Sequence, residues 1–207
     1  MLTRIVLGLM LVWVSTMSQA YEFELVKEEN NIRVFKAGLD DKDIYRLGIE
    51  TEVDLSIDSM LKMNTDPQNW HTWMPKVTSA QFVEPGLKRY TVHVQYESPW
   101  PVKNRESVTE GLVSKDPNTG VVTLKFHTVE SNVPASEDYT RIPYIDGFWT
   151  FTPVENGAVR VRYETAVDPG GSVPKWLSNI EAVDIPYQTM VKMLENIEPY
   201  RDVRIDW

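Results

Sequence analysis

The segment 174–197 constrains the fold most, because it is one long helical pattern in a chain whose other segments are mostly strand-like. Its apolar residues recur at spacings of three and four and form a stripe along one helix face: Leu177, Ile180, Val183, Tyr187, Met190, Leu194 and Ile197. Pro174 suits a first helical turn, whereas Pro186 is expected to kink the helix or divide it in two. Such a stripe must be buried against another element.

Nine segments before this helix have strand patterns. In Tyr45–Val53, alternate residues from Tyr45 to Val53 are apolar or Thr, while Arg46, Glu50 and Glu52 occupy the other face. Asn30-Asn31, Pro85-Gly86 and Asn156-Gly157 are turn signals between neighbouring strands. The predicted strands are 23–28, 32–37, 45–53, 77–83, 88–96, 105–114, 120–129, 147–153 and 158–168. Their succession predicts an antiparallel meander with one dry face.

The hydrophobic period changes after the third strand. Ser56 precedes a helical pattern at 57–64, and Asp66-Pro67 begins a second short helix that runs to Trp73 and ends before Pro75. We therefore predict an α+β fold in which a curved antiparallel sheet wraps around a long C-terminal helix, with two short helices after the third strand.

The first twenty residues have the pattern of a secretory signal peptide. Arg4 precedes the apolar run 5–14, and the polar stretch 15–20 ends in Ser18-Gln19-Ala20. An apolar run of this length is shorter than the roughly 20 residues that a membrane span needs. We predict cleavage after Ala20, one domain over residues 21–207, and export, most simply to a bacterial periplasm.

Composition excludes several classes of protein. The chain carries a formal charge of −9, which disfavours nucleic-acid binding, and it has no cysteine for disulfides or thiolate metal sites. Seven Trp and nine Tyr indicate that a core or a ligand covers much apolar surface. We expect no cofactor and no metal, and we expect a monomer.

Four segments, in this order, resemble the START (StAR-related lipid transfer) family of the helix-grip (Bet v 1-like) superfamily. They are residues 69–75 (NWHTWMP), 99–106 (PWPVKNRE), 147–153 (GFWTFTP) and 168–177 (DPGGSVPKWL). The resemblance implies a tunnel for one hydrophobic molecule between the sheet and the C-terminal helix, with the loop 97–104 and that helix at the entrance. The acid–arginine pair of the steroid-binding branch cannot be placed in this sequence.

On this basis we predict a carrier or sensor of a lipid-like ligand. The candidate lining residues are Tyr90, Val92, Val94, Tyr96, Trp149, Phe151, Val161, Tyr163, Tyr187 and Met190. The opposite strand face remains an alternative, since a shift of one residue exchanges the faces. The candidate residues for a gate or a transient membrane contact are Trp100, Lys103, Trp176 and Leu177. Trp100 lies between two prolines and close to basic residues, which suits a membrane interface; the alternative is a lid over the core.

Enzyme activity is the main rival hypothesis. A cyclase- or hydratase-like protein would use a cavity His or Tyr for acid–base chemistry, and His93 and His127 are the candidates. The three histidines have no metal-binding spacing, and no hydrolase or nucleotide motif occurs. Glu106 beside Arg105 is most simply a solvated or structural pair. A partner-binding module without a cavity is the third possibility.

Overall fold

The computed structural model describes residues 21–39, 44–173 and 175–207, so the predicted signal peptide lies outside the described residues. The strands of this part form one sheet, in the order β1-β2-β3-β10-β9-β7-β6-β5-β4, with β8 pairing to β6. They are β1 (Glu24–Glu29), β2 (Ile32–Gly38), β3 (Tyr45–Val53), β4 (Val77–Glu84), β5 (Arg89–Tyr96), β6 (Asn104–Lys115), β7 (Val122–Thr128), β8 (Tyr139–Arg141), β9 (Tyr144–Pro153) and β10 (Val159–Asp168). All pairings are antiparallel except the one between β6 and β8.

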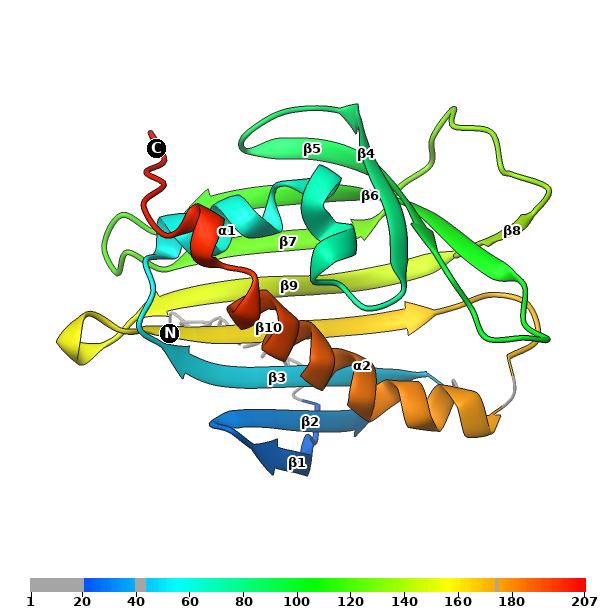
Figure 1. The fold of residues 1–207 in the computed structure, drawn as a ribbon, viewed down its shortest axis with the longest axis horizontal. Coiled ribbons are helices and arrows are strands. Elements are labelled where there is room, and N and C mark those ends of the chain that lie inside the picture. Colours follow the sequence, from blue (N-terminus) through cyan, green and yellow to red (C-terminus); the bar gives the residue numbers. More distant parts are fainter. Residues whose placement is uncertain (1–20, 40–43, 174) are drawn as a thin grey trace, which may run out of the picture.

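All helical elements except a short one in the turn between β9 and β10 lie over one face of the sheet. Figure 1 shows α2 crossing this face diagonally, with the short helices beside it. The helical elements are α1 (Ile57–Asn64), η1 (Pro67–Thr72), η2 (Glu155–Gly157), α2 (Lys175–Glu195) and η3 (Glu198–Tyr200). This is the predicted helix-grip arrangement, an α+β fold, and the prediction is confirmed.

Local chemistry explains where α1 begins and how it is held. The Ser56 hydroxyl accepts a hydrogen bond from the Ser59 N–H, which satisfies one of the free donors of the first turn. Met60, Leu61 and Met63 are then fully buried in the core. The same buried cluster contains strand residues and the methionines of α2, so sheet, α1 and α2 share one core.

Two details differ from the sequence prediction. Of the two outcomes predicted for Pro186, a kink or a division, the division does not occur, because α2 continues through Pro186; its contacts with β2 and β3 hold it to the sheet despite the hydrogen bond that proline removes. Strand β8 was not predicted, because three residues are too few for a periodic pattern. Its pairing with Asn104–Glu106 of β6 depends on the tertiary fold.

Candidate ligand-binding cavity

A cavity of about 380 Å³ lies between the sheet and α2. Strands β3, β5, β6, β7, β9 and β10 contribute to its wall, and α1, η1 and α2 contribute the other side. Most of the wall is apolar, with side chains such as Leu47, Leu124, Phe126, Ile145 and Val167. An apolar cavity with few polar groups is typical of a site for a small hydrophobic ligand.

Four of the ten predicted lining residues border this cavity: Tyr90, Tyr96, Trp149 and Tyr163. Tyr90 and Tyr96 lie on the face of β5 whose other members, Val92 and Val94, are buried in the core. The face of β5 that carries His93 lies on the other side of the sheet. The structure therefore shows that the β5 face with Tyr90 and Tyr96, and not the face with His93, is turned toward the cavity. The sequence had left this choice open.

The other six predicted lining residues do not border the cavity. Val92, Val94, Phe151, Val161 and Met190 are buried in the cluster that also contains Met60, Leu61 and Met63. Tyr187 is half-buried, with its hydroxyl accepting a hydrogen bond from Asn30 and Lys27 over its ring. These residues do not border the cavity because α1 and the methionines of α2 fill part of the space over the sheet. The cavity occupies only the rest of that space.

Three aromatic side chains pack against one another in the cavity wall. Trp149 and Tyr163 are direct partners on β9 and β10, and their ring centroids are 4.3 Å apart. Phe126 stacks on Tyr163, with ring centroids 6.1 Å apart. The Tyr163 ring thus contacts two aromatic neighbours in the cavity wall.

Sequence reasoning missed most of the polar residues of the cavity. Arg105, Thr109 and Thr165 border it and are nearly inaccessible to solvent. The Arg105 guanidinium donates to the main-chain oxygens of Lys103 and Gly170. The signal that could have found Arg105 and Thr109 is the strand period of two, which places residues 105, 107 and 109 on one face of β6.

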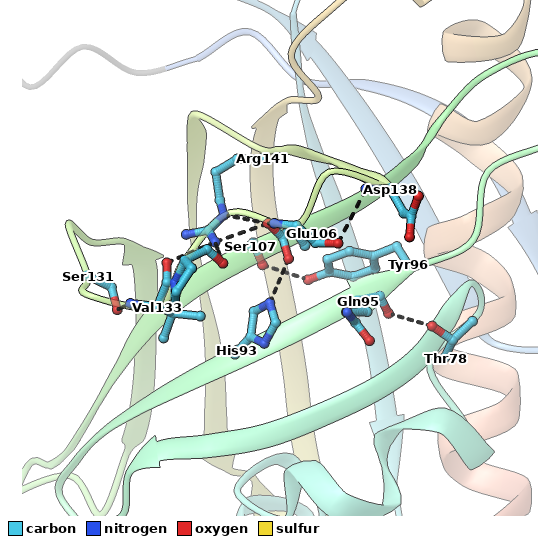
Figure 2. Close-up of polar contacts among 12 residues, drawn as sticks. Thr78, His93, Gln95, Tyr96, Glu106, Ser107, Ser131, Val133, Asp138 and Arg141 are labelled. Atoms are coloured by element: carbon cyan, nitrogen blue, oxygen red, sulfur yellow. Dashed lines mark hydrogen bonds and ion pairs between the residues drawn. The ribbon is translucent and has the colours of Figure 1, made fainter.

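Arg105 and Glu106 do not form the predicted pair, because neighbouring residues of a strand point to opposite faces. The Glu106 side chain is 0% exposed and lies on the side of the sheet away from the cavity. It accepts hydrogen bonds from His93 Nε2 at 2.9 Å, from the Ser136 N–H at 3.0 Å and from Arg141 Nη2 at 3.0 Å (Figure 2).

This cluster determines the charge state of Glu106. Burial raises the pKa of its carboxyl, but the hydrogen bonds from Ser136, His93 and Arg141 and the Arg141 charge outweigh burial and lower that pKa below its ordinary value. Arg141 also donates to the main-chain oxygens of Val133 and Pro134. The buried carboxylate therefore ties the segment before β8 to the sheet.

None of the three histidines borders the cavity. His93 contacts Glu106, and His127 lies 3.7 Å from Glu110 on the same outer face. His71 is exposed in η1. The histidine–carboxylate pair that an enzyme hypothesis would use thus exists, but it lies outside the cavity.

The loop between β5 and β6 lies at the cavity. Glu97, Ser98, Pro99 and Val102 contribute to the cavity wall, whereas Trp100 is 91% exposed. Lys103 is exposed and its ammonium donates to the main-chain oxygen of Glu137. Trp100 is therefore not a lid that packs on the core.

The other predicted gate residues, Trp176 and Leu177, fall in the first turns of α2, where the side chains lie outside the described part of the chain. Over the described ranges, no helix is long and apolar enough to cross a membrane. The same ranges contain no group of three or more His, Asp or Glu placed to hold a metal ion.

Comparison with known proteins identifies the family of the chain. The model of the family described as polyketide cyclase/dehydrase and lipid transport matches residues 47–196. An uncharacterised protein of Pseudomonas aeruginosa is 23% identical over 172 residues, which are 83% of this chain and 84% of that protein.

Two solved structures have similar folds. The crystal structure of a STAR-related lipid transfer protein from Xanthomonas axonopodis has a TM-score of 0.78 at 26% identity, over 84% of this chain and 98% of that one. The crystal structure of human STARD10 has a TM-score of 0.74 over 86% of this chain and 74% of that one; at 17% identity it bears on the fold alone.

Proposed function

The chain belongs to the polyketide cyclase/dehydrase and lipid transport family, and from this membership and its cavity we infer that it binds one lipid or similar hydrophobic small molecule between the sheet and α2. The observation that carries the proposal is the apolar cavity of about 380 Å³ in the middle of the fold. That volume is at the lower end of the range for small-molecule sites, which suits one compact ligand. The similarity to a protein named for lipid transfer supports the same function.

Binding and release of the ligand require no chemical reaction. Apolar ligand surface that leaves water for the cavity gains about 25 cal/mol per Å², and the preformed aromatic wall of Trp149, Tyr163 and Phe126 requires little rearrangement. The ligand then leaves by mass action when a membrane or another protein binds it more tightly. We propose a carrier or sensor, since either role requires only reversible binding.

We expect protein purified from its own compartment to contain a bound hydrophobic molecule in native mass spectrometry. The same protein, after removal of that ligand, should take up the neutral fluorescent probe N-phenyl-1-naphthylamine with a rise in fluorescence. The two measurements are independent. A protein that contains no ligand and takes up no probe would contradict the proposed function.

We propose further that Trp100 contacts membranes during ligand exchange. Its ring is exposed beside the cavity wall formed by its own loop, and Lys103 follows closely. Tryptophan with nearby cations is typical of a membrane interface. Export of the mature chain, residues 21–207, to a periplasm would place such a surface between membranes, and this part of the proposal depends on the predicted signal peptide.

The variant Trp100→Ala is expected to slow ligand transfer to anionic phospholipid vesicles by about tenfold, with the melting temperature within about 2 °C of the wild type, because an exposed side chain contributes little to stability. Transfer is measured by stopped-flow fluorescence. Trp207→Ala is a matched control, since Trp207 is also exposed and bonds to Asp58. Equal slowing by both variants would argue against a role for the loop.

An enzyme of the cyclase or dehydrase type is the second candidate, because the family description includes such enzymes. The observation that weighs against it is the position of His93 and His127, which lie on the outer face and not in the cavity. The phenols of Tyr96 and Tyr163, whose pKa values burial raises, are groups of the cavity wall that could donate a proton. A change in the covalent structure of the bound ligand during incubation would favour the enzyme.

A further inference from the structure

Tyr90 is the most buried tyrosine of the cavity wall, at 4% exposed, and its ring lies across β6. Tyr90 pairs with Gly111 of β6, and Gly111 pairs with Phe126 of β7. A Cβ atom added to Gly111 would come within 2.3 Å of the Tyr90 Cζ atom, so the ring occupies the space of the missing side chain. Because the hydroxyl is attached to Cζ, and all three residues border the cavity, it lies over β6 on the cavity side.

The Tyr90 hydroxyl has no hydrogen-bond partner among the residues that the structure describes. The Tyr96 hydroxyl, by contrast, lies 3.2 Å from that of Ser107. Burial raises the pKa of Tyr90, so the phenol keeps its proton at physiological pH. A buried donor without an acceptor is costly, and a ligand oxygen that contacts this hydroxyl would remove that cost.

Tyr90 also marks the end of the cavity that is remote from the loop between β5 and β6. That loop contributes to the cavity wall where β5 ends, at Tyr96. A strand rises by about 3.4 Å per residue, so Tyr90 lies roughly 20 Å from Tyr96 along β5. We call the Tyr90 end of the cavity its inner end. A ligand that passes this loop would bring its leading end to Tyr90.

We propose that the Tyr90 hydroxyl donates a hydrogen bond to a neutral carbonyl oxygen at the inner end of the bound hydrophobic molecule. This inference rests on the proposed function and narrows its ligand class to apolar molecules with a carbonyl group at one end. A carbonyl oxygen accepts through its lone pairs and brings no proton that needs an acceptor. A carboxylate is a poorer match, because its charge would be desolvated beside the rings of Phe82 and Phe126.

The test compares 2-undecanone with 2-methyl-1-undecene, an alkene of the same shape in which a CH2 group replaces the ketone oxygen. Their Kd values follow from displacement of N-phenyl-1-naphthylamine, whose own Kd is measured for each protein. We expect Tyr90→Phe to weaken binding of the ketone about tenfold and to change binding of the alkene by less than about twofold, because only the ketone loses a hydrogen bond. Each ligand is compared with itself in two proteins, so its solubility in water cancels.

The position of the carbonyl gives a second measurement. In 6-undecanone the oxygen lies in the middle of the same chain and cannot reach the inner end while that chain fills the cavity. Tyr90→Phe should therefore weaken its binding by less than about twofold. The melting temperature of this variant should stay within about 2 °C of the wild type or rise, because the hydroxyl that is removed has no partner among the described residues.

Tyr200→Phe is the matched control, because it removes the hydroxyl of another buried tyrosine, which lies outside the cavity wall and donates to Asp66 at 2.8 Å. It should lower the melting temperature by about 5 °C and leave the Kd of each ketone within about twofold.

An unchanged Kd of 2-undecanone in Tyr90→Phe overturns the inference and leaves the proposed function in place. An equal loss for ketone and alkene also overturns it, since the effect would then come from packing. An equal loss for the two ketones contradicts a contact at the inner end. A wild type that takes up neither the naphthylamine nor any of the three ligands contradicts the proposed function itself.

Discussion

Replacement of Glu106 with alanine is expected to lower the melting temperature by about 10 °C, the largest stability effect that we predict for a single side chain outside the apolar core. The change removes the acceptor of His93, Arg141 and the Ser136 N–H. Loss of one partner from a buried ion pair costs about 3 kcal/mol, and a domain of this size loses roughly 3 °C per kcal/mol. Differential scanning calorimetry at pH 7 measures the shift.

The same carboxylate predicts how stability depends on pH. The folded-state pKa of Glu106 is lower than its ordinary value of 4.5. The ionised Glu106 carboxylate therefore contributes fully to the free energy of unfolding at a pH above 4.5. This contribution is lost as the pH falls through the lower pKa of the folded state. The wild type should lose more stability than Glu106→Ala between pH 5 and the acid limit.

Glu52→Ala is the matched control, because Glu52 also bonds to an arginine, Arg160, on a neighbouring strand but is about half exposed. An exposed pair contributes less than about 1 kcal/mol, so its melting temperature should fall by less than about 3 °C. Similar small shifts for both variants would mean that the Glu106 cluster does not stabilise the segment before β8.

The variant Thr109→Trp is expected to weaken uptake of N-phenyl-1-naphthylamine at least 100-fold. Thr109 lines the cavity from the middle of β6, and an indole in its place occupies much of the roughly 380 Å³ that a ligand needs. The added ring enters empty space, so the melting temperature should stay within about 5 °C of the wild type, less than overpacking of a filled core would cause. Probe fluorescence and calorimetry measure the two effects.

Thr123→Trp adds the same ring to β7 outside the cavity wall, and it should bind the probe as the wild type does. If Thr109→Trp bound the probe with unchanged affinity, the probe would occupy some other place on the protein. Binding in the cavity would then be contradicted, whatever the affinity of the wild type.

The strands, the short helices and the long terminal helix could be predicted from the sequence because their signals are local. Alternation in β3, the turn pairs, and Ser56 as the cap of α1 depend on residues close in the chain. The four segments that resemble START domains supplied the arrangement of these elements, and the observed sheet confirms it. Strand β8 escaped prediction because its pairing partner lies far along the chain.

The residues of the candidate site could likewise be predicted only in part. Tyr90, Tyr96, Trp149 and Tyr163 could be predicted because they share the apolar face of their strands, but so do Val92, Val94, Phe151 and Val161, which are core. No local pattern separates the two groups. The separation depends on where α1 and the methionines of α2 fill the space above the sheet.

The sequence by itself therefore determined most of the elements, which residues share a face within each of them, and the apolar character of the interior, since each follows from the period of two or of about 3.6 residues. Only the tertiary structure decided which strand face lines the cavity, which part of that interior is empty, and that Glu106 meets His93 and Arg141 on the outer face. These features require residues of different strands and helices to come within a few ångströms of each other. That proximity depends on the curvature of the sheet and the packing of its helices, which no local pattern encodes.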